Sequence, residues 1–162
     1  MKVIGFAGFS GAGKTTLITA VIPLLVEAGV RPSLIKHAHH AFDVDRPGKD
    51  SHRYREAGAG EVMVGSARRW ALMHELREAA EPTLPELIGR LSPCDLVLVE
   101  GFKNAPIDKI EVWREGCAQP MLWPRDGNIV AVASDVALQT TLPRLDINDP
   151  GQVAGFILRR LR

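Results

Sequence analysis

The feature that most constrains this chain is a glycine-rich turn over residues 8–15, Gly-Phe-Ser-Gly-Ala-Gly-Lys-Thr. The apolar run Val3–Ala7 before it predicts a strand, and the apolar spacing after it, from Leu17 to Leu25, predicts a helix. This order is the P-loop pattern, because glycine lets backbone N–H groups curl around a phosphate where the helix begins. The binding residues that the pattern predicts are Gly8, Ser10, Gly11, Ala12, Gly13, Lys14, Thr15 and Thr16.

Two side chains of this turn carry chemistry of their own. Lys14 is placed to reach the β- and γ-phosphates as a mobile point charge, and we predict a catalytic role for it. The hydroxyl of Thr15 is placed to ligate Mg²⁺, which prefers oxygen ligands. A glycine-rich turn without a ligand is the alternative, but a strand before and a helix after the turn favour the P-loop.

The rest of the chain continues the alternation of strands and helices. A second strand is expected at 32–37, and buried-type strands at 95–101 and 128–135. Residues 61–66 and 69–73 predict a β-hairpin, 85–91 a polar helix and 149–162 a C-terminal helix. We therefore expect an α/β fold, a P-loop NTPase-like and mostly parallel sheet flanked by helices, with a β-hairpin extension. In such a sheet the P-loop lies at the carboxyl edge of the strands, where ligands bind.

Length and composition restrict the classes of protein that remain. A chain of 162 residues with 46% hydrophobic and 24% charged residues fits one domain, so we expect a single P-loop nucleotide-binding domain over residues 1–162. The net charge of +1 argues against nucleic acid or a membrane as partner, and no apolar run reaches the length of a membrane span. Cys94 and Cys117 form no framework, which favours a reducing cytoplasm.

An unusual density of titratable groups marks residues 36–53. This segment contains little apolar surface and a Pro-Gly turn, so it resembles a functional loop at the mouth of the site. His37, His39 and His40 suggest a metal site, but Lys36 and Lys49 would oppose a cation. Binding of an anion or phosphate suits the His and Lys groups better, and a solvated surface loop is the third alternative.

Glu100 ends the apolar run Leu96–Val99, which predicts a central strand of the sheet. An acid in that position of a P-loop fold holds Mg²⁺ or its water, and we predict catalytic and metal-binding roles for Glu100 beside Thr15. The alternative is an acid that is merely exposed at a strand end. After it, the alternation over Ile110–Arg114 predicts a half-exposed strand, and Trp123 falls in a Pro-flanked loop.

Asp135 ends the strand expected at 128–135, as Glu100 ends the central strand. A carboxylate there can accept hydrogen bonds from N1 and the exocyclic amine of guanine, which adenine cannot offer because its N1 carries no hydrogen. The Asn/Thr-Lys-x-Asp motif of typical GTPases is absent, so a role as a helix or turn cap is an equal alternative for Asp135.

The motifs together resemble the molybdopterin-guanine dinucleotide biosynthesis protein B (MobB) family over nearly the whole chain. Pro-Gly-Lys-Asp-Ser at 47–51 and Glu-Gly-Phe-Lys at 100–103 are the most specific of them. The other stretches that carry the resemblance are 8–15, 36–43, 53–59, 69–73, 131–135 and 145–149. Within these motifs we predict that His37, Lys49, Asp50, Arg53 and Lys103 also bind cofactor.

The resemblance implies a homodimeric GTP-binding adapter with weak, Mg²⁺-dependent GTPase activity. Such an adapter assists the guanylyltransferase that attaches GMP to molybdopterin in molybdenum cofactor synthesis, and molybdopterin or its guanylated product would be a further ligand. Two other classes stay open. A small-molecule kinase would use Arg53 and Arg55 over the γ-phosphate, and a metal-delivery GTPase of the hydrogenase or urease maturation type would use the histidine cluster.

Overall fold

The computed structural model describes residues 1–38, 42–117 and 119–161. The chain forms two compact units, of which the first comprises Met1–His37 with Leu84–Arg162 and the second Ala38–Thr83. The expectation of one nucleotide-binding domain over residues 1–162 therefore stays a prediction.

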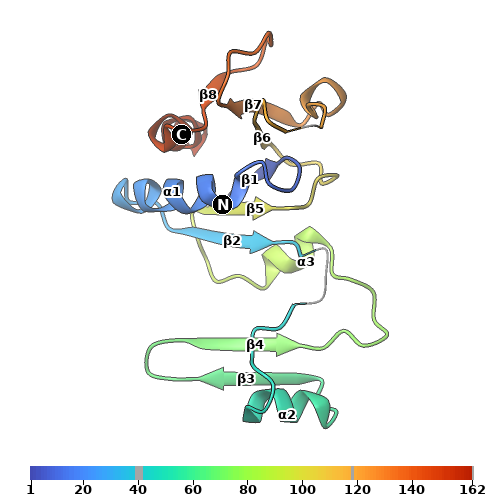
Figure 1. Ribbon diagram of the computed structural model, residues 1–162. Coiled ribbons are helices and arrows are strands. Elements are labelled where there is room, and N and C mark those ends of the chain that lie inside the picture. Colours follow the sequence, from blue (N-terminus) through green and yellow to red (C-terminus); the bar gives the residue numbers. More distant parts are fainter. Residues whose placement is uncertain (39–41, 118, 162) are drawn as a thin grey trace. The chain divides into compact units, whose positions relative to one another are not determined.

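The first unit is built on a six-stranded sheet in which every neighbouring pair is parallel (Figure 1). Across the sheet the strands are β2 (Pro32–Lys36), β5 (Leu96–Glu100), β1 (Lys2–Ala7), β6 (Lys109–Trp113), β7 (Ile129–Ser134) and β8 (Arg144–Asp146). Because all strands run the same way, their carboxyl ends meet at one edge. The predicted parallel α/β sheet is confirmed.

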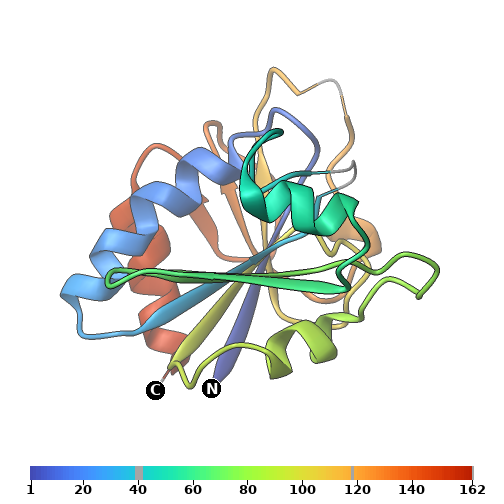
Figure 2. The ribbon, with the colours of Figure 1, turned by 90° about the horizontal axis from the view of Figure 1, so that it is seen from below.

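Helices cover both faces of this sheet. Helices α1 (Lys14–Glu27) and α4 (Pro150–Leu161) lie next to each other on one face, as Figure 2 shows, and share a core with β1, β5, β6 and β7. The short helix α3 (Leu84–Gly89) packs on the other face against Val97 and Val99. Strand β5 is buried on both faces, as its unbroken apolar run predicts.

Strand β6 corrects one expectation. The alternation over Ile110–Arg114 predicts a half-exposed strand, but Lys109 and Glu111 are buried. The Lys109 ammonium is paired with Asp126 at 2.6 Å and donates to two backbone carbonyls, and Glu111 accepts the N–H groups of Leu122 and Trp123. Burial raises the pKa of Glu111, and the two N–H donors oppose that rise. Lys109 and Glu111 can therefore be buried because each is paired with an opposite charge or with backbone hydrogen-bonding groups.

Two further elements, a short 3-10 helix and a short strand, are not among those that the sequence predicts. Trp123 is not in an irregular loop but opens a short 3-10 helix, η1 (Trp123–Arg125), whose first N–H groups are the ones that Glu111 accepts. Strand β8 was not expected at all, because three residues give no period and its pairing with β7 alone defines it.

The second unit contains α2 (Asp50–Glu56) and an antiparallel hairpin of β3 (Glu61–Gly65) and β4 (Trp70–His74). The hairpin is confirmed, and α2 has Lys49 as its N-cap, without a side-chain hydrogen bond at the cap. Trp70 is 65% exposed and is therefore not a core residue.

None of the helices in the described part of the chain has both the length and the apolar character of a membrane span.

Candidate functional site

The candidate site lies where the parallel strands end. The register pairs Phe6 of β1 and Lys36 of β2 with Glu100 of β5, so these three strand ends are level with one another. On the other side of β1, Arg114, Asp135 and Asn148 follow the ends of β6, β7 and β8. The P-loop stands between these two groups, since it connects the end of β1 to the start of α1.

Three glycines of the loop, Gly8, Gly11 and Gly13, have a positive φ, which other residues rarely adopt. Gly8 has φ +147°, and a Cβ placed on it would lie 2.4 Å from the carbonyl oxygen of Val112 in β6. Gly13, the N-cap of α1, has φ 93°. The first bond of the helix runs from the N–H of Leu17 to the carbonyl of Gly13, so the N–H groups of Lys14, Thr15 and Thr16 have no partner within the helix. Such a helix start is an anion site.

Positive side chains surround this helix start. The Lys14 ammonium donates to the carbonyls of Gly8 and Phe9 at 3.0 and 2.9 Å. Its pKa is lowered, first by burial and further by Lys103 and Lys36, while Glu100 opposes the change. Lys103 itself lies over the ring of Phe9, 4.7 Å from its centroid. Three ammonium groups therefore share the field of one carboxylate, and an anion would relieve their repulsion.

Thr15 and Glu100, the predicted magnesium ligands, are in direct contact. The Thr15 hydroxyl donates to Oε1 of Glu100 at 2.9 Å, and Lys36 lies 3.7 Å from Oε2. Glu100 is buried at the end of β5, followed by Gly101 at φ +113°, where a Cβ would lie 2.6 Å from that of His37. A hydroxyl and a carboxylate oxygen fit Mg²⁺, which takes few protein ligands and keeps its waters.

The contact predicts how one substitution acts. Glu100→Gln keeps the shape and the acceptor for Thr15 but removes the charge. On the prediction that this site binds GTP with Mg²⁺, the affinity for GTP should fall about 10-fold in Mg²⁺ and stay unchanged in chelator. Titration calorimetry in both conditions measures this. Glu27→Gln, at the exposed end of α1, is the matched control. An equal loss with and without Mg²⁺ would show that Glu100 acts on the fold and not on the metal.

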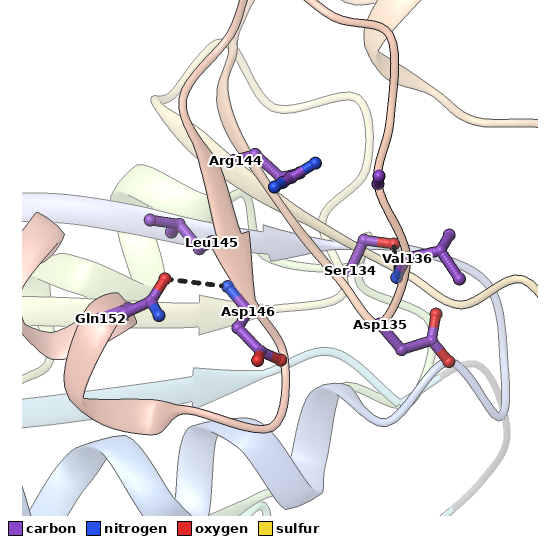
Figure 3. Close-up of a pocket in the computed structure, with 8 residues that line it drawn as sticks. Ser134, Asp135, Val136, Arg144, Leu145, Asp146 and Gln152 are labelled. Carbon is purple, nitrogen blue, oxygen red and sulfur yellow. Dashed lines mark hydrogen bonds between the residues drawn. The ribbon is translucent and has the colours of Figure 1, made fainter.

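Asp135 lies just beyond the end of β7. Its Oδ1 accepts the backbone N–H of Glu115 at 3.1 Å, and its Oδ2 lies 3.4 Å from a guanidinium nitrogen of Arg114. Beside it is a polar pocket of about 300 Å³, which Ser134, Arg144, Asp146 and Gln152 also line (Figure 3). The bond to Glu115 is compatible with the predicted cap role, and the role as base reader stays a prediction.

The remaining predicted residues divide between the two units. His37 and Lys103 belong to the unit that carries the P-loop, and the His37 ring lies against Phe102 at 4.8 Å. Lys49, Asp50 and Arg53 are exposed at the start of α2 in the second unit, so their place beside the P-loop stays a prediction. His39 and His40 lie outside the described residues. Within those that are described, no group of three His, Cys, Asp or Glu side chains could hold a metal ion.

Arg55 is not the mobile arginine that the kinase alternative needs. It donates to Asp45 at 2.6 Å, to Glu75 at 2.7 Å and to Asp43 at 2.9 Å, all within the second unit. The hydrogen bonds to Asp45 and Glu75 raise its pKa further above its usual value. A guanidinium with three carboxylate partners holds a loop in place.

Two charged residues of this edge are not among the site residues that the sequence predicts. Lys36 ends β2, a strand that the sequence does predict, and lies beside Glu100. Arg114 follows β6 and lies between Asp135 and Asn148. The signal that could have found both is their position directly at the end of a strand of a parallel sheet.

A parallel sheet whose first strand leads through a glycine-rich loop into a helix start defines a P-loop NTPase-like protein. The family model of molybdopterin guanine dinucleotide synthesis protein B matches residues 3–135. The chain belongs to this MobB family.

Similar proteins agree with that assignment. A molybdopterin-guanine dinucleotide biosynthesis adapter protein of Escherichia coli is 47% identical over 98% of this chain and 92% of its own length. One from Haemophilus influenzae is 42% identical over 97% of this chain and 88% of its own. The crystal structure of a molybdopterin-guanine biosynthesis protein B, 30% identical, superposes with a TM-score of 0.80 over 99% of both chains.

Proposed function

We propose that this protein is a GTP-binding adapter of molybdopterin guanine dinucleotide biosynthesis. The observation that carries the proposal is the P-loop helix start with Lys14 and the Thr15–Glu100 pair beside it. The helix start and Lys14 would hold the phosphates, and Thr15 and Glu100 would hold Mg²⁺. Asp135 would read guanine. The names of the relatives, which are adapter proteins, support the role in the pathway.

An adapter role agrees better with this site than fast catalysis. A rapid phosphoryl transfer enzyme needs a mobile cation over the γ-phosphate, and Arg55, one of the two arginines that the kinase alternative would use, is engaged in three ion pairs. We therefore assign weak GTPase activity, with Lys14 and Glu100 as its catalytic residues, and a main role in assisting the guanylyltransferase that transfers GMP. The protein would act in the cytoplasm, as one P-loop nucleotide-binding domain.

The segment around Lys49 would serve the adapter function and not hydrolysis. Lys49 and Arg53 are exposed cations one turn apart at the start of α2, suited to an anionic pterin phosphate or to a partner that presents one. Asp50, in the first turn of the same helix, would belong to this second site, and His37, in the first unit, stays a predicted ligand-binding residue.

A double variant tests that division of labour. Lys49→Ala with Arg53→Ala should leave GTP affinity within a few-fold and lower the stimulation of GMP transfer by about 10-fold, the effect of lost charged contacts. The rate of GMP transfer by the guanylyltransferase, with and without the variant, is the measurement. Lys2→Ala with Arg90→Ala removes the same charges from exposed sites in the other unit. Loss of GTP binding in the first variant would place these cations in the nucleotide site.

The homodimer expected for the family would bury one face of the hairpin. Met63, Leu72 and Trp70 share that face and are exposed, Trp70 by 65%. An apolar face of this kind favours contact with a second copy. Met63→Asp should therefore convert a dimer to a monomer in sedimentation equilibrium, whereas Val64→Asp on the opposite face should not. A monomeric parent protein would refute the homodimer, and an undisturbed dimer in Met63→Asp would exclude this face.

A further inference from the structure

Three side chains from three neighbouring strand ends meet beside the P-loop. Arg114 follows β6, and its guanidinium lies 3.4 Å from Oδ2 of Asp135 and 3.4 Å from Oδ1 of Asn148. A Cβ placed on Gly13 would lie 3.4 Å from Nε of the same arginine. The guanidinium therefore lies beside the loop that would hold the phosphates and next to the carboxylate that would read the base.

The contacts of Arg114 are loose by the standard of this protein. Arg31 lies 2.9 Å from Asp95 and Arg160 lies 2.6 Å from Asp108, within the usual range of charged hydrogen bonds. At 3.4 Å, the guanidinium of Arg114 can turn toward another acceptor at little cost. Asp135 does not depend on it, because the N–H of Glu115 holds Oδ1 at 3.1 Å.

The electrostatic environment of Arg114 also disfavours a positive charge that serves only to stabilise the fold. The start of a helix carries partial positive charge, and a cation beside it is repelled. Gly13 is the N-cap of α1, a helix of 14 residues. Among the described residues, Asp135 and Asn148 accept from this guanidinium at 3.4 Å each, so the placement suits a guanidinium whose principal acceptor belongs to a ligand.

Guanine has the complementary pattern of groups. One edge of the base presents two acceptors, O6 and N7, to which arginine binds in a bidentate manner, and the other edge presents the N1 and N2 donors. Resting on the proposed GTP binding, we propose that Arg114 donates to O6 and N7 of guanine while Asp135 accepts from N1 and N2. An ionised carboxylate has about four acceptor positions, so Asp135 can keep Glu115 and still receive the base.

The pair would exclude adenine by repulsion at both edges. Adenine presents an amine donor where guanine has O6, and a bare N1 acceptor where guanine has a donor. The guanidinium of Arg114 would then face a donor and the carboxylate of Asp135 an acceptor. Arg114 would thus provide part of the specificity in a chain that lacks the Asn/Thr-Lys-x-Asp motif.

Nucleotide analogues separate the two contacts. The experiment measures the affinities of three nucleotides: GTP, 7-deaza-GTP, which lacks N7, and inosine triphosphate, which lacks the amine. The proteins compared are the parent, Arg114→Ala, Arg114→Lys and Asp135→Asn. The parent should prefer GTP over each analogue by about 10-fold or more. Arg114→Ala should lose the preference over 7-deaza-GTP only, Arg114→Lys should regain part of it, and Asp135→Asn should lose the preference over inosine triphosphate only.

Arg144→Ala is the matched control, because this arginine lines the pocket that Asp135 also lines, whereas Arg114 is not among the lining residues. Three results would overturn the assignment of Arg114. The parent protein could lack the preference for GTP over 7-deaza-GTP, Arg114→Ala could keep it, or Arg144→Ala could lose it. These results leave the proposed GTP binding intact. A parent that binds no GTP overturns both.

Discussion

Replacing Lys14 by alanine should lower the affinity for Mg²⁺-GTP by about 100-fold or more, because a lost charged hydrogen bond costs ~1.5–3 kcal/mol and Lys14 would contact two phosphates. The ammonium lies at the helix start and donates to the carbonyls of Gly8 and Phe9. Two neighbouring ammonium groups are engaged elsewhere, since Lys103 lies over the Phe9 ring and Lys36 beside Glu100. Titration calorimetry measures the change.

The matched control for this prediction is Lys2→Ala. Lys2 lies in the same strand that leads into the P-loop, but at its exposed amino end, so the variant loses the same charge away from the carboxyl edge. It should bind GTP as the parent does. Unchanged GTP affinity in Lys14→Ala, with an intact fold by circular dichroism, would refute the assignment of the P-loop.

Gly8→Ala should have the largest effect on the fold, a loss of roughly 3 kcal/mol or more in the free energy of unfolding. The new Cβ would stand 2.4 Å from the carbonyl oxygen of Val112, a backbone atom of the buried strand β6, which cannot move without disturbing the sheet. A positive φ of 147° adds backbone strain. Relief would require β1 and β6 to separate, so the P-loop should also lose GTP.

Gly11→Ala separates the clash from the strain. Gly11 belongs to the same loop and has φ +80°, but a Cβ there meets no atom within 4 Å. This variant should lose only about 1–2 kcal/mol of stability in urea unfolding, the cost of a left-handed residue with a side chain. Equal losses in the two variants would contradict the role of the Gly8–Val112 contact.

The sequence predicted the parts of the molecule that local pattern determines. The spacing of glycines marks the P-loop, and an apolar run marks the central strand at 96–100. The alternation of apolar and polar residues marks the hairpin. Strand β6 was misjudged because burial of Lys109 and Glu111 depends on Asp126 and on backbone groups of residues 103–123, which no local pattern reveals.

For the candidate site, the sequence indicates which strand ends lie beside the P-loop. Thr15 and Glu100, 85 residues apart, are hydrogen-bonded because a strand end beside the P-loop fixes where an acid can stand, and their role as Mg²⁺ ligands stays a prediction. The position of Arg114 at the end of a strand is visible in the sequence, but its contact with Asn148 is not, because that contact depends on β8, a strand of three residues that only its pairing with β7 defines. The segment around Lys49 lies in the second unit, where sequence alone gives no distance to the P-loop.

Calorimetric titration of the parent protein with GTP and with ATP, each with and without Mg²⁺, tests the central claim most directly. If the P-loop, the Thr15–Glu100 pair and Asp135 form a GTP site, GTP should bind at one site per chain, more tightly with Mg²⁺, and about 10-fold or more in preference to ATP. Absence of binding by either nucleotide, or equal affinity for ATP and GTP, would contradict the account.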